Sequence, residues 1–345
     1  EDGAALLAPF STWLLRTDGT PPGARWRARV EPPRGLAFVS GTFRARDGDG
    51  YEGLVSDLAQ TPYGGFGPFE VRTVPVAGAS IDVAITPGDT GVSRDRLVAW
   101  IAEEARAVAA YYGRFPVPRA LVLVRAGDRG GVGEGATMGE GGASIMLDVG
   151  RDTTEAELAD DWILVHEMVH VAFPSVLRPW AEEGLATYVE PIIRARAGLR
   201  DRDHVWRDLV LGLPKGQPGP GDRGLDRTPT WGRTYWGGAA FWLLADVETR
   251  RRTNGARSLD DALRAIVDAG GNVSVTWDLD RALRVGDRAT GVPVLEELRG
   301  QMGPAPFHVD LDALFAKLGV SLRGRAVVYD DQAPLAWIRR AITGG

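Results

Sequence analysis

The segment WILVHEMVH, at residues 162–170, constrains the fold more than any other part of this chain. It contains two of the four histidines, His166 and His170, which are four positions apart. On an α-helix this spacing places both imidazoles on one face, about one turn apart, where they can reach one metal ion. A buried helix that contains two histidines for packing alone is the alternative interpretation.

The boundaries of this helix are marked by local signals on both sides. Thr154 and Glu157 form a capping-box pattern before the apolar residues, and Pro174 cannot continue a helix. The sequence therefore predicts a helix over 154–173.

Glu167 directly follows the first histidine and projects from an adjoining strip of the helix surface. In the H-E-x-x-H arrangement the two histidines bind Zn²⁺ and the glutamate is the general base. The chain has no cysteine, so any metal site must use His, Asp or Glu. We therefore expect one Zn²⁺ per chain, with His166 and His170 as ligands and Glu167 as a catalytic residue.

A third ligand is required, and the sequence offers the glutamates Glu182, Glu183 and Glu190. A metzincin would have a histidine six positions after His170, but Val176 stands there, so that class is excluded. Thermolysin-like spacing, with nineteen intervening residues, selects Glu190. An acidic residue in the first turn of a helix also stabilises its positive end, which accounts for Glu182 without a metal.

The residues around Glu183 give a different answer from the spacing. They follow the pattern W-x-x-E-G-x-A-x-Y, which resembles the zinc-ligand helix of the aminopeptidase N and glycyl aminopeptidase families. In those gluzincins the glutamate before the glycine binds zinc, so the resemblance implies Glu183 as the third ligand. Twelve residues separate it from His170, against eighteen in typical aminopeptidase N relatives, and we expect a shorter connecting loop. The matching residues are Trp180, Glu183, Gly184, Ala186 and Tyr188.

A second block, residues 234–264, resembles the helix pair that follows the metal site in glycyl aminopeptidase-like proteins. In that family a tyrosine donates a hydrogen bond to the oxyanion of the tetrahedral intermediate, and the matching residue is Tyr235. A phenol aimed at developing negative charge stabilises the transition state by a few kcal/mol. The alternative is that Tyr235 and Trp236 only pack the start of a helix.

The segment 135–147 corresponds to the Gly-x-Met-Glu-Asn segment that binds the substrate amino group in aminopeptidase N relatives. Met138 aligns with the methionine of that motif, but a glycine takes the glutamate position and Glu140 follows one residue later. We expect an edge strand at 143–147 to pair with an extended substrate. Glu140 or Glu134 would bind the amine, although both also fit solvated loop charges. The predicted substrate-binding residues are Glu140, Gly141, Gly142 and Ala143.

The rest of the chain predicts an α+β fold. Short alternating runs separated by Gly, Pro and Asp indicate β-strands before residue 90, and Ser93 and Gly113 bound a long helix. A strand at 120–127, a glycine-rich loop and another strand follow, before a mainly helical remainder. We expect a small β-rich region at 1–90 and a thermolysin/aminopeptidase-like, mainly helical zincin domain at 91–345 that ends in a helical cap. The loops are predicted at 127–142 and 212–230; the later helices are predicted at 180–196, 236–253 and 259–269.

Composition limits the partners. The net charge of −6 and the absence of a long basic run argue against nucleic acid. No stretch of about 18 apolar residues is present, so no membrane span is expected. The sequence begins at Glu1 without methionine, which we interpret as removal of a signal peptide and a periplasmic or secreted location.

These observations predict a zinc-dependent peptidase, aminopeptidase-like, that acts on a peptide or protein substrate. An endopeptidase, a catalytically inactive peptide-binding protein on a peptidase fold, and zinc-dependent hydrolysis of a substrate other than a peptide are the alternatives. The sequence favours catalysis because both the base, Glu167, and the oxyanion donor, Tyr235, are present. His204 and His308 lie outside the motifs, and we expect structural or surface roles for them.

Overall fold

The computed structural model describes residues 5–16 and 18–344. The chain forms two compact units. The first unit contains residues 5–16, 18–175 and 272–276. The second unit contains residues 176–271 and 277–344. The predicted boundary near residue 90 stays a prediction. The strands on its amino-terminal side include two that belong to the main sheet of the first unit.

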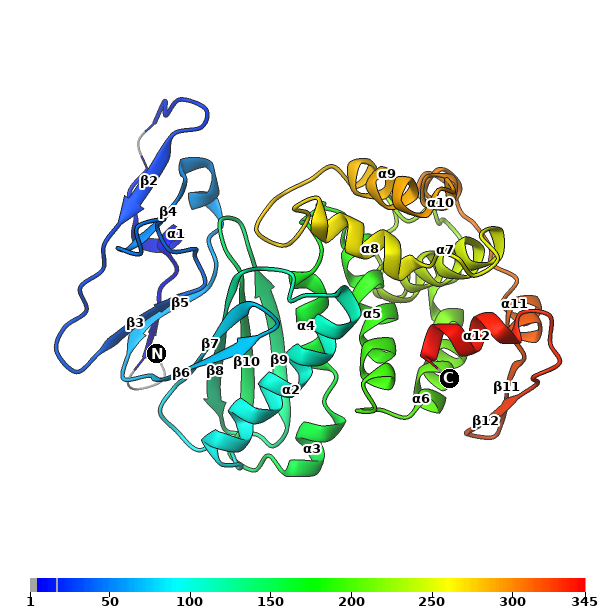
Figure 1. Cartoon of the computed structure of the whole chain (residues 1–345), viewed down its shortest axis with the longest axis horizontal. Coiled ribbons are helices and arrows are strands. Elements are labelled where there is room, and N and C mark those ends of the chain that lie inside the picture. Colours follow the sequence, from blue (N-terminus) through cyan, green and yellow to red (C-terminus); the bar gives the residue numbers. More distant parts are fainter. Residues whose placement is uncertain (1–4, 17, 345) are drawn as a thin grey trace. The chain divides into compact units, whose positions relative to one another are not determined.

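The first unit begins with two small antiparallel sheets, ordered β1-β5-β3 and β2-β4 (Figure 1). A hydrophobic cluster of Phe10, Tyr51 and Leu58, with the aromatic rings of Trp26 and Phe38 against it, forms their core. These rings meet at centroid distances of 4.9 to 5.5 Å, in the tilted and edge-on arrangements that aromatic pairs prefer. The elements are β1 Leu6–Leu7, α1 Phe10–Trp13, β2 Arg25–Ala28, β3 Ala37–Ser40, β4 Tyr51–Leu54, η1 Val55–Ala59 and β5 Gly64–Gly67.

A five-stranded sheet, ordered β6-β7-β8-β10-β9, forms the centre of the first unit (Figure 1). β7, β8 and β10 are parallel, and the outer strands β6 and β9 are antiparallel to their neighbours. The middle of β8 is a run of buried apolar residues, as expected of a strand covered on both faces. The bounds are β6 Glu70–Val76, β7 Ala79–Ile85, β8 Arg119–Gly127, β9 Val132–Met138 and β10 Ser144–Gly150.

The structure corrects two predictions in this sheet. The segment 127–142 is not a loop throughout, because β9 occupies its middle. The strand predicted at 143–147 is not an edge strand, since β10 pairs with β8 on one side and with β9 on the other. The free edge on this side of the sheet therefore belongs to β9.

The helices of the first unit are α2 Arg94–Tyr112, α3 Glu155–Asp160 and α4 Ile163–Val171. Ser93 and Gly113 bound α2 as predicted: the Ser93 hydroxyl accepts a hydrogen bond from a backbone N–H, and Gly113 takes the left-handed conformation. The predicted helix at 154–173 is instead two helices. Asp161, the C-cap of α3, has extended backbone, and its carboxylate accepts hydrogen bonds from the N–H groups of Ile163 and Leu164 in the first turn of α4.

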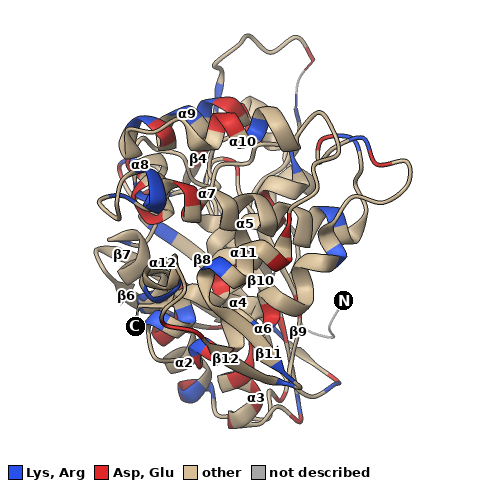
Figure 2. Ribbon diagram, turned by 90° about the vertical axis from the view of Figure 1, so that its right-hand side faces the viewer, with Lys and Arg blue, Asp and Glu red and all other residues tan. Residues whose placement is uncertain are grey.

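The second unit is mainly helical, as predicted, and carries a small hairpin near its end (Figure 1). No helix in the described part of the chain is long and apolar enough to cross a membrane. Figure 2 shows the positions of acidic and basic residues interspersed along the helices, in keeping with the modest net charge of −6. The elements are α5 Pro179–Arg196, α6 Arg202–Gly212, η2 Leu213–Gly216, η3 Arg233–Gly237, α7 Gly238–Arg252, α8 Leu259–Asp268, α9 Leu279–Thr290, α10 Val294–Met302, α11 Leu311–Leu318, β11 Val320–Arg323, β12 Ala326–Tyr329 and α12 Ala336–Thr343.

Candidate metal centre

The two predicted histidine ligands lie on α4, on the same side of the helix. His166 is buried and His170 is half-buried, and their ring centroids are 5.0 Å apart. Trp162, which precedes the helix, meets the His166 ring edge-on with a centroid distance of 5.3 Å. The apolar residues of α4 are almost all buried, so packing of the helix fixes the direction in which both imidazoles project.

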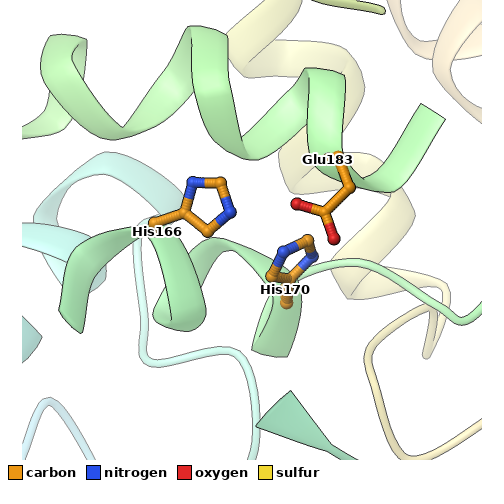
Figure 3. A group of neighbouring side chains, drawn as sticks. All are labelled: His166, His170 and Glu183. Atoms are coloured by element: carbon orange, nitrogen blue, oxygen red, sulfur yellow. The ribbon is translucent and has the colours of Figure 1, made fainter. Parts of the chain in front are cut away.

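Glu183, on the first turns of α5, completes a group of three metal-binding side chains. One ligand atom from each of His166, His170 and Glu183 lies within 4.8 Å of the other two. Figure 3 shows both imidazoles and the carboxylate directed toward a common point. In the described part of the chain this is the one group of at least three His, Cys, Asp or Glu residues that could hold a metal ion.

The other candidate glutamates have different surroundings. Glu190 is buried, and its carboxylate lies 3.6 Å from the guanidinium of Arg194, one turn further along α5. Glu182 accepts a hydrogen bond of 2.8 Å from the backbone N–H of Val176. The structure therefore places Glu183 with the histidines, and gives the other two carboxylates contacts of their own.

The donor set fits Zn²⁺. Two imidazole nitrogens and one carboxylate oxygen are the ligands found in catalytic zinc sites, which keep a further position open for water or substrate. Six or more oxygen ligands, which Ca²⁺ or Mg²⁺ would require, are not assembled by these three side chains. The predicted ligands therefore suit the predicted metal.

Glu167, the predicted base, is held by a residue that the sequence did not single out. The hydroxyl of Thr137, on β9, lies 2.7 Å from the Glu167 carboxylate and 3.0 Å from the Glu167 backbone oxygen. Gly135 lies two residues earlier on the same face of β9, and a Cβ there would come within 2.4 Å of Ile163 and 3.0 Å of Glu167. The glycine therefore allows β9 to approach α4 closely enough for this hydrogen bond.

Tyr63 interacts electrostatically with Glu167, and no sequence motif marks it. Burial raises the pKa of its phenol, and the negative charge of Glu167 raises it further. Its backbone N–H donates to the hydroxyl of Ser144 at the start of β10, and that hydroxyl donates to the Met138 carbonyl. These bonds connect the segment before β5 to the end of β9 and fix the backbone of Tyr63 there.

Tyr235 lies in the π-helical turn η3 and is half-buried. Such turns interrupt a helix and are frequent at functional sites. The turn leads into α7, which crosses α5 at a glycine pair: a Cβ on Gly184 would come within 2.3 Å of Gly238. This close crossing accounts for the glycine that follows Glu183, and it holds the ligand helix against the segment that carries Tyr235.

The backbone of the predicted substrate-binding segment is largely engaged within the protein. The N–H groups of Gly141 and Ala143 donate to the carbonyls of Ser274 and Gly41, and Gly142 forms a bridge with Thr42. The Glu140 carboxylate accepts a hydrogen bond from Thr276. The N–H groups of Gly141 and Ala143 are thus bonded within the protein, and substrate binding by this segment, including amine binding by Glu140, stays a prediction.

His204 and His308 take no part in the group. His204 lies between the guanidinium groups of Arg200 and Arg207 on α6, and His308 is exposed. Both placements agree with the structural or surface roles expected for them.

Comparison of the sequence with protein-family models and with curated proteins gives no match. Comparison of the structure does. An aminopeptidase N family protein from Idiomarina loihiensis superimposes with a TM-score of 0.67 at 12% identity, covering 93% of this chain and 62% of that protein. An M1 zinc metallopeptidase from Deinococcus radiodurans gives a TM-score of 0.50 at 16% identity, covering 80% of this chain and 64% of that one. A mutant of the Deinococcus enzyme, solved with a Tyr-Ser-Ala substrate, gives 0.50 at 15% identity.

These identities are low, so the likeness establishes the fold. The chain spans about three-fifths of the length of these solved proteins. The predicted α+β, aminopeptidase-like zincin architecture is confirmed by the likeness, which extends over 93% of this chain.

Proposed function

We propose that this chain, which has the gluzincin aminopeptidase-like fold, is a zinc-dependent peptidase. The observation that carries the proposal is the convergence of His166, His170 and Glu183, with Glu167 on the same helix as the two histidines. The solved proteins of the same fold include zinc metallopeptidases, which supports zinc as the metal and a peptide as the substrate. The ligands would be the two histidines and Glu183, with one ion per chain.

The metal ion and the side chains of the protein would have separate roles in peptide hydrolysis. Bound Zn²⁺ would act as a Lewis acid toward the scissile carbonyl and lower the pKa of a water ligand toward roughly 7. Glu167 takes a proton from the attacking water and delivers it to the leaving amine. Thr137 holds the Glu167 carboxylate in place for both transfers, and Tyr235 donates a hydrogen bond to the oxyanion.

We propose further that the activity is aminopeptidase-like, with the substrate backbone pairing along the free edge of β9. An edge strand presents unpaired N–H and C=O groups, which an extended peptide can extend by one strand. The contact of Thr137 and Gly135 with α4 places this edge next to Glu167. Glu140 and Glu134, at or near the two ends of β9, are the candidates for binding a free amino group.

A panel of peptides with free and acetylated amino termini tests this proposal. We expect the zinc-loaded protein to cleave free peptides and to lose activity when the metal is removed by a chelator and regain it on addition of zinc. Equal cleavage of acetylated peptides would identify an endopeptidase instead. Tight peptide binding without cleavage by the zinc-loaded protein would favour the non-catalytic alternative.

Replacing Thr137 with Val should lower kcat about tenfold with a smaller change in KM. The substitution keeps the shape and removes the hydroxyl, and a hydrogen bond to a charged group is worth roughly 1.5–3 kcal/mol. Thr137→Ser, which retains the hydroxyl, is the matched control and should keep most of the activity. Equal losses in both variants would indicate that the packing of the whole side chain, and not the hydroxyl specifically, is what matters. Steady-state kinetics on the best peptide of the panel measures the difference.

A further inference from the structure

Trp231, in the second unit, is a large aromatic residue on the surface beside Tyr235. It is 62% exposed, and its ring centroid lies 5.9 Å from that of Tyr235, one helical turn later, with the rings inclined by 31°. Leu211, at the end of α6, is also more than half exposed. An exposed aromatic face adjoining a predicted catalytic side chain is a typical place for a ligand to pack.

Lys215 brings a positive charge to the same surface. Its ammonium group lies 5.9 Å from the ring centroid of Trp231 and 5.7 Å from that of Trp236. Both distances are at the outer limit of a cation–π contact, so the three ammonium donors stay available to a further partner. Among the described residues no carboxylate lies within the 4 Å of an ion pair with it. This cation next to an aromatic face therefore has no ion-pair partner among residues 5–16 and 18–344.

The chain holds this lysine in place. The turn η2, which carries Lys215, packs on η3 through glycines: a Cβ on Gly232 would come within 2.2 Å of the Lys215 carbonyl, and one on Gly216 within 2.2 Å of the Gly237 nitrogen. Arg233 donates to the Gly216 carbonyl and forms a buried ion pair of 2.8 Å with Asp222. The backbone of Lys215 is thus fixed relative to Tyr235, which lies in the same turn as Arg233.

We infer that Lys215 and Trp231 form a subsite for a carboxylate of the peptide substrate, a substrate class that rests on the proposed peptidase function. The indole face packs against the apolar part of the peptide, and the ammonium group pairs with the anion. The carboxylate is either the carboxy terminus of a short peptide or an acidic side chain. The chemistry is the same in both cases, and the probes below separate them.

Calorimetric binding to the zinc-loaded Glu167→Gln variant tests the subsite without turnover. The probes are Ala-Ala-Glu and Ala-Ala-Gln, each as the free acid and as the carboxy-terminal amide. We expect Lys215→Gln to weaken binding of the probes that carry the preferred carboxylate about three- to tenfold. The affinity for the amide of Ala-Ala-Gln, which has no carboxylate, should not change. Lys215→Arg keeps the positive charge and should keep the preference for the carboxylate probes. Loss confined to the free acids identifies the carboxy terminus, and loss confined to the Glu peptides identifies the side chain. The preference should also shrink at high salt, because exposed charges are screened.

The only other lysine of the chain, Lys317, supplies the matched control. It is exposed on α11, so Lys317→Gln makes the same change in net charge and should leave every probe unaffected. Trp231→Ala should weaken all four probes, because the indole face contacts the apolar part of each. Equal effects of Lys215→Gln on charged and neutral probes, or no binding of any probe, would overturn the subsite. Charge-selective binding by a protein that cleaves no peptide in the panel would refute the peptidase function alone and keep the subsite.

Discussion

Replacing Glu167 with Gln should lower kcat by roughly a thousandfold while the protein keeps its zinc, since general acid–base catalysis contributes about 10²–10⁴. The amide has the size of the carboxylate and can still accept the Thr137 hydrogen bond, so the local packing should survive. It cannot accept the proton of the attacking water. Turnover of the best peptide, together with the zinc content of the same sample, measures the two quantities separately.

Glu103→Gln supplies a control for the loss of one negative charge. Glu103 is exposed on α2, and we expect wild-type kinetics and zinc content from that variant. A Glu167→Gln protein that retains both zinc and full activity would contradict the role of the base. Loss of zinc from this variant would show that Glu167 supports the metal site, in which case the kinetic loss could not be assigned to proton transfer.

The parts of the fold that follow from short-range chemistry could be predicted from the sequence. The Thr154–Glu157 capping box forms as expected, with each side chain bonded to the backbone of the other residue. The hydrogen bonds that the Glu157 carboxylate accepts from the Thr154 backbone N–H and hydroxyl lower the pKa of Glu157. The ends of α2 at Ser93 and Gly113 were predictable for the same reason, because a cap is decided by residues within one turn.

Long-range packing explains what the sequence could not show. Glycines normally indicate a loop, but Gly135 is in a strand because only a residue without a side chain lets β9 approach α4. Thr137 is 30 positions from Glu167 in the chain, and no local pattern connects them. Tyr63 lies in the segment directly before β5, a strand of another sheet. The sequence does contain one signal for this contact: Thr137 stands alone among glycines, and a strand and the helix with the two histidines follow it.

The choice between Glu183 and Glu190 shows the same limit within one helix. Seven residues rotate an α-helix by nearly two full turns, so both carboxylates project from almost the same face of α5. Helical periodicity therefore cannot separate them. What separates them is position along the axis: Glu183 adjoins the Gly184–Gly238 crossing and is grouped with the histidines, whereas Glu190 is one turn before Arg194 and lies next to it.

Replacing Glu183 and Glu190 in two separate variants should therefore affect different properties: zinc affinity in the first and thermal stability in the second. Glu183→Gln is expected to weaken zinc binding by about 100-fold or more, because even residues that only support a ligand cost 10- to 100-fold when changed. Peptide hydrolysis should fall with it, and excess zinc should restore part of the activity. The thermal stability of the metal-free protein should fall less than in Glu190→Gln, since Glu183 is half-buried and Glu190 is buried.

Glu190→Gln should show the reverse pattern. Its carboxylate is buried beside the buried guanidinium of Arg194, and loss of one partner from a buried ion pair costs roughly 3–5 kcal/mol. We expect a lowered Tm and retained zinc affinity at temperatures where the variant is folded. Zinc titration with a competing chelator and thermal unfolding of the metal-free proteins give both quantities. If Glu190→Gln lost the metal and Glu183→Gln kept it, the ligand would be the one favoured by thermolysin-like spacing, and the grouping of Glu183 with His166 and His170 would not be the zinc site.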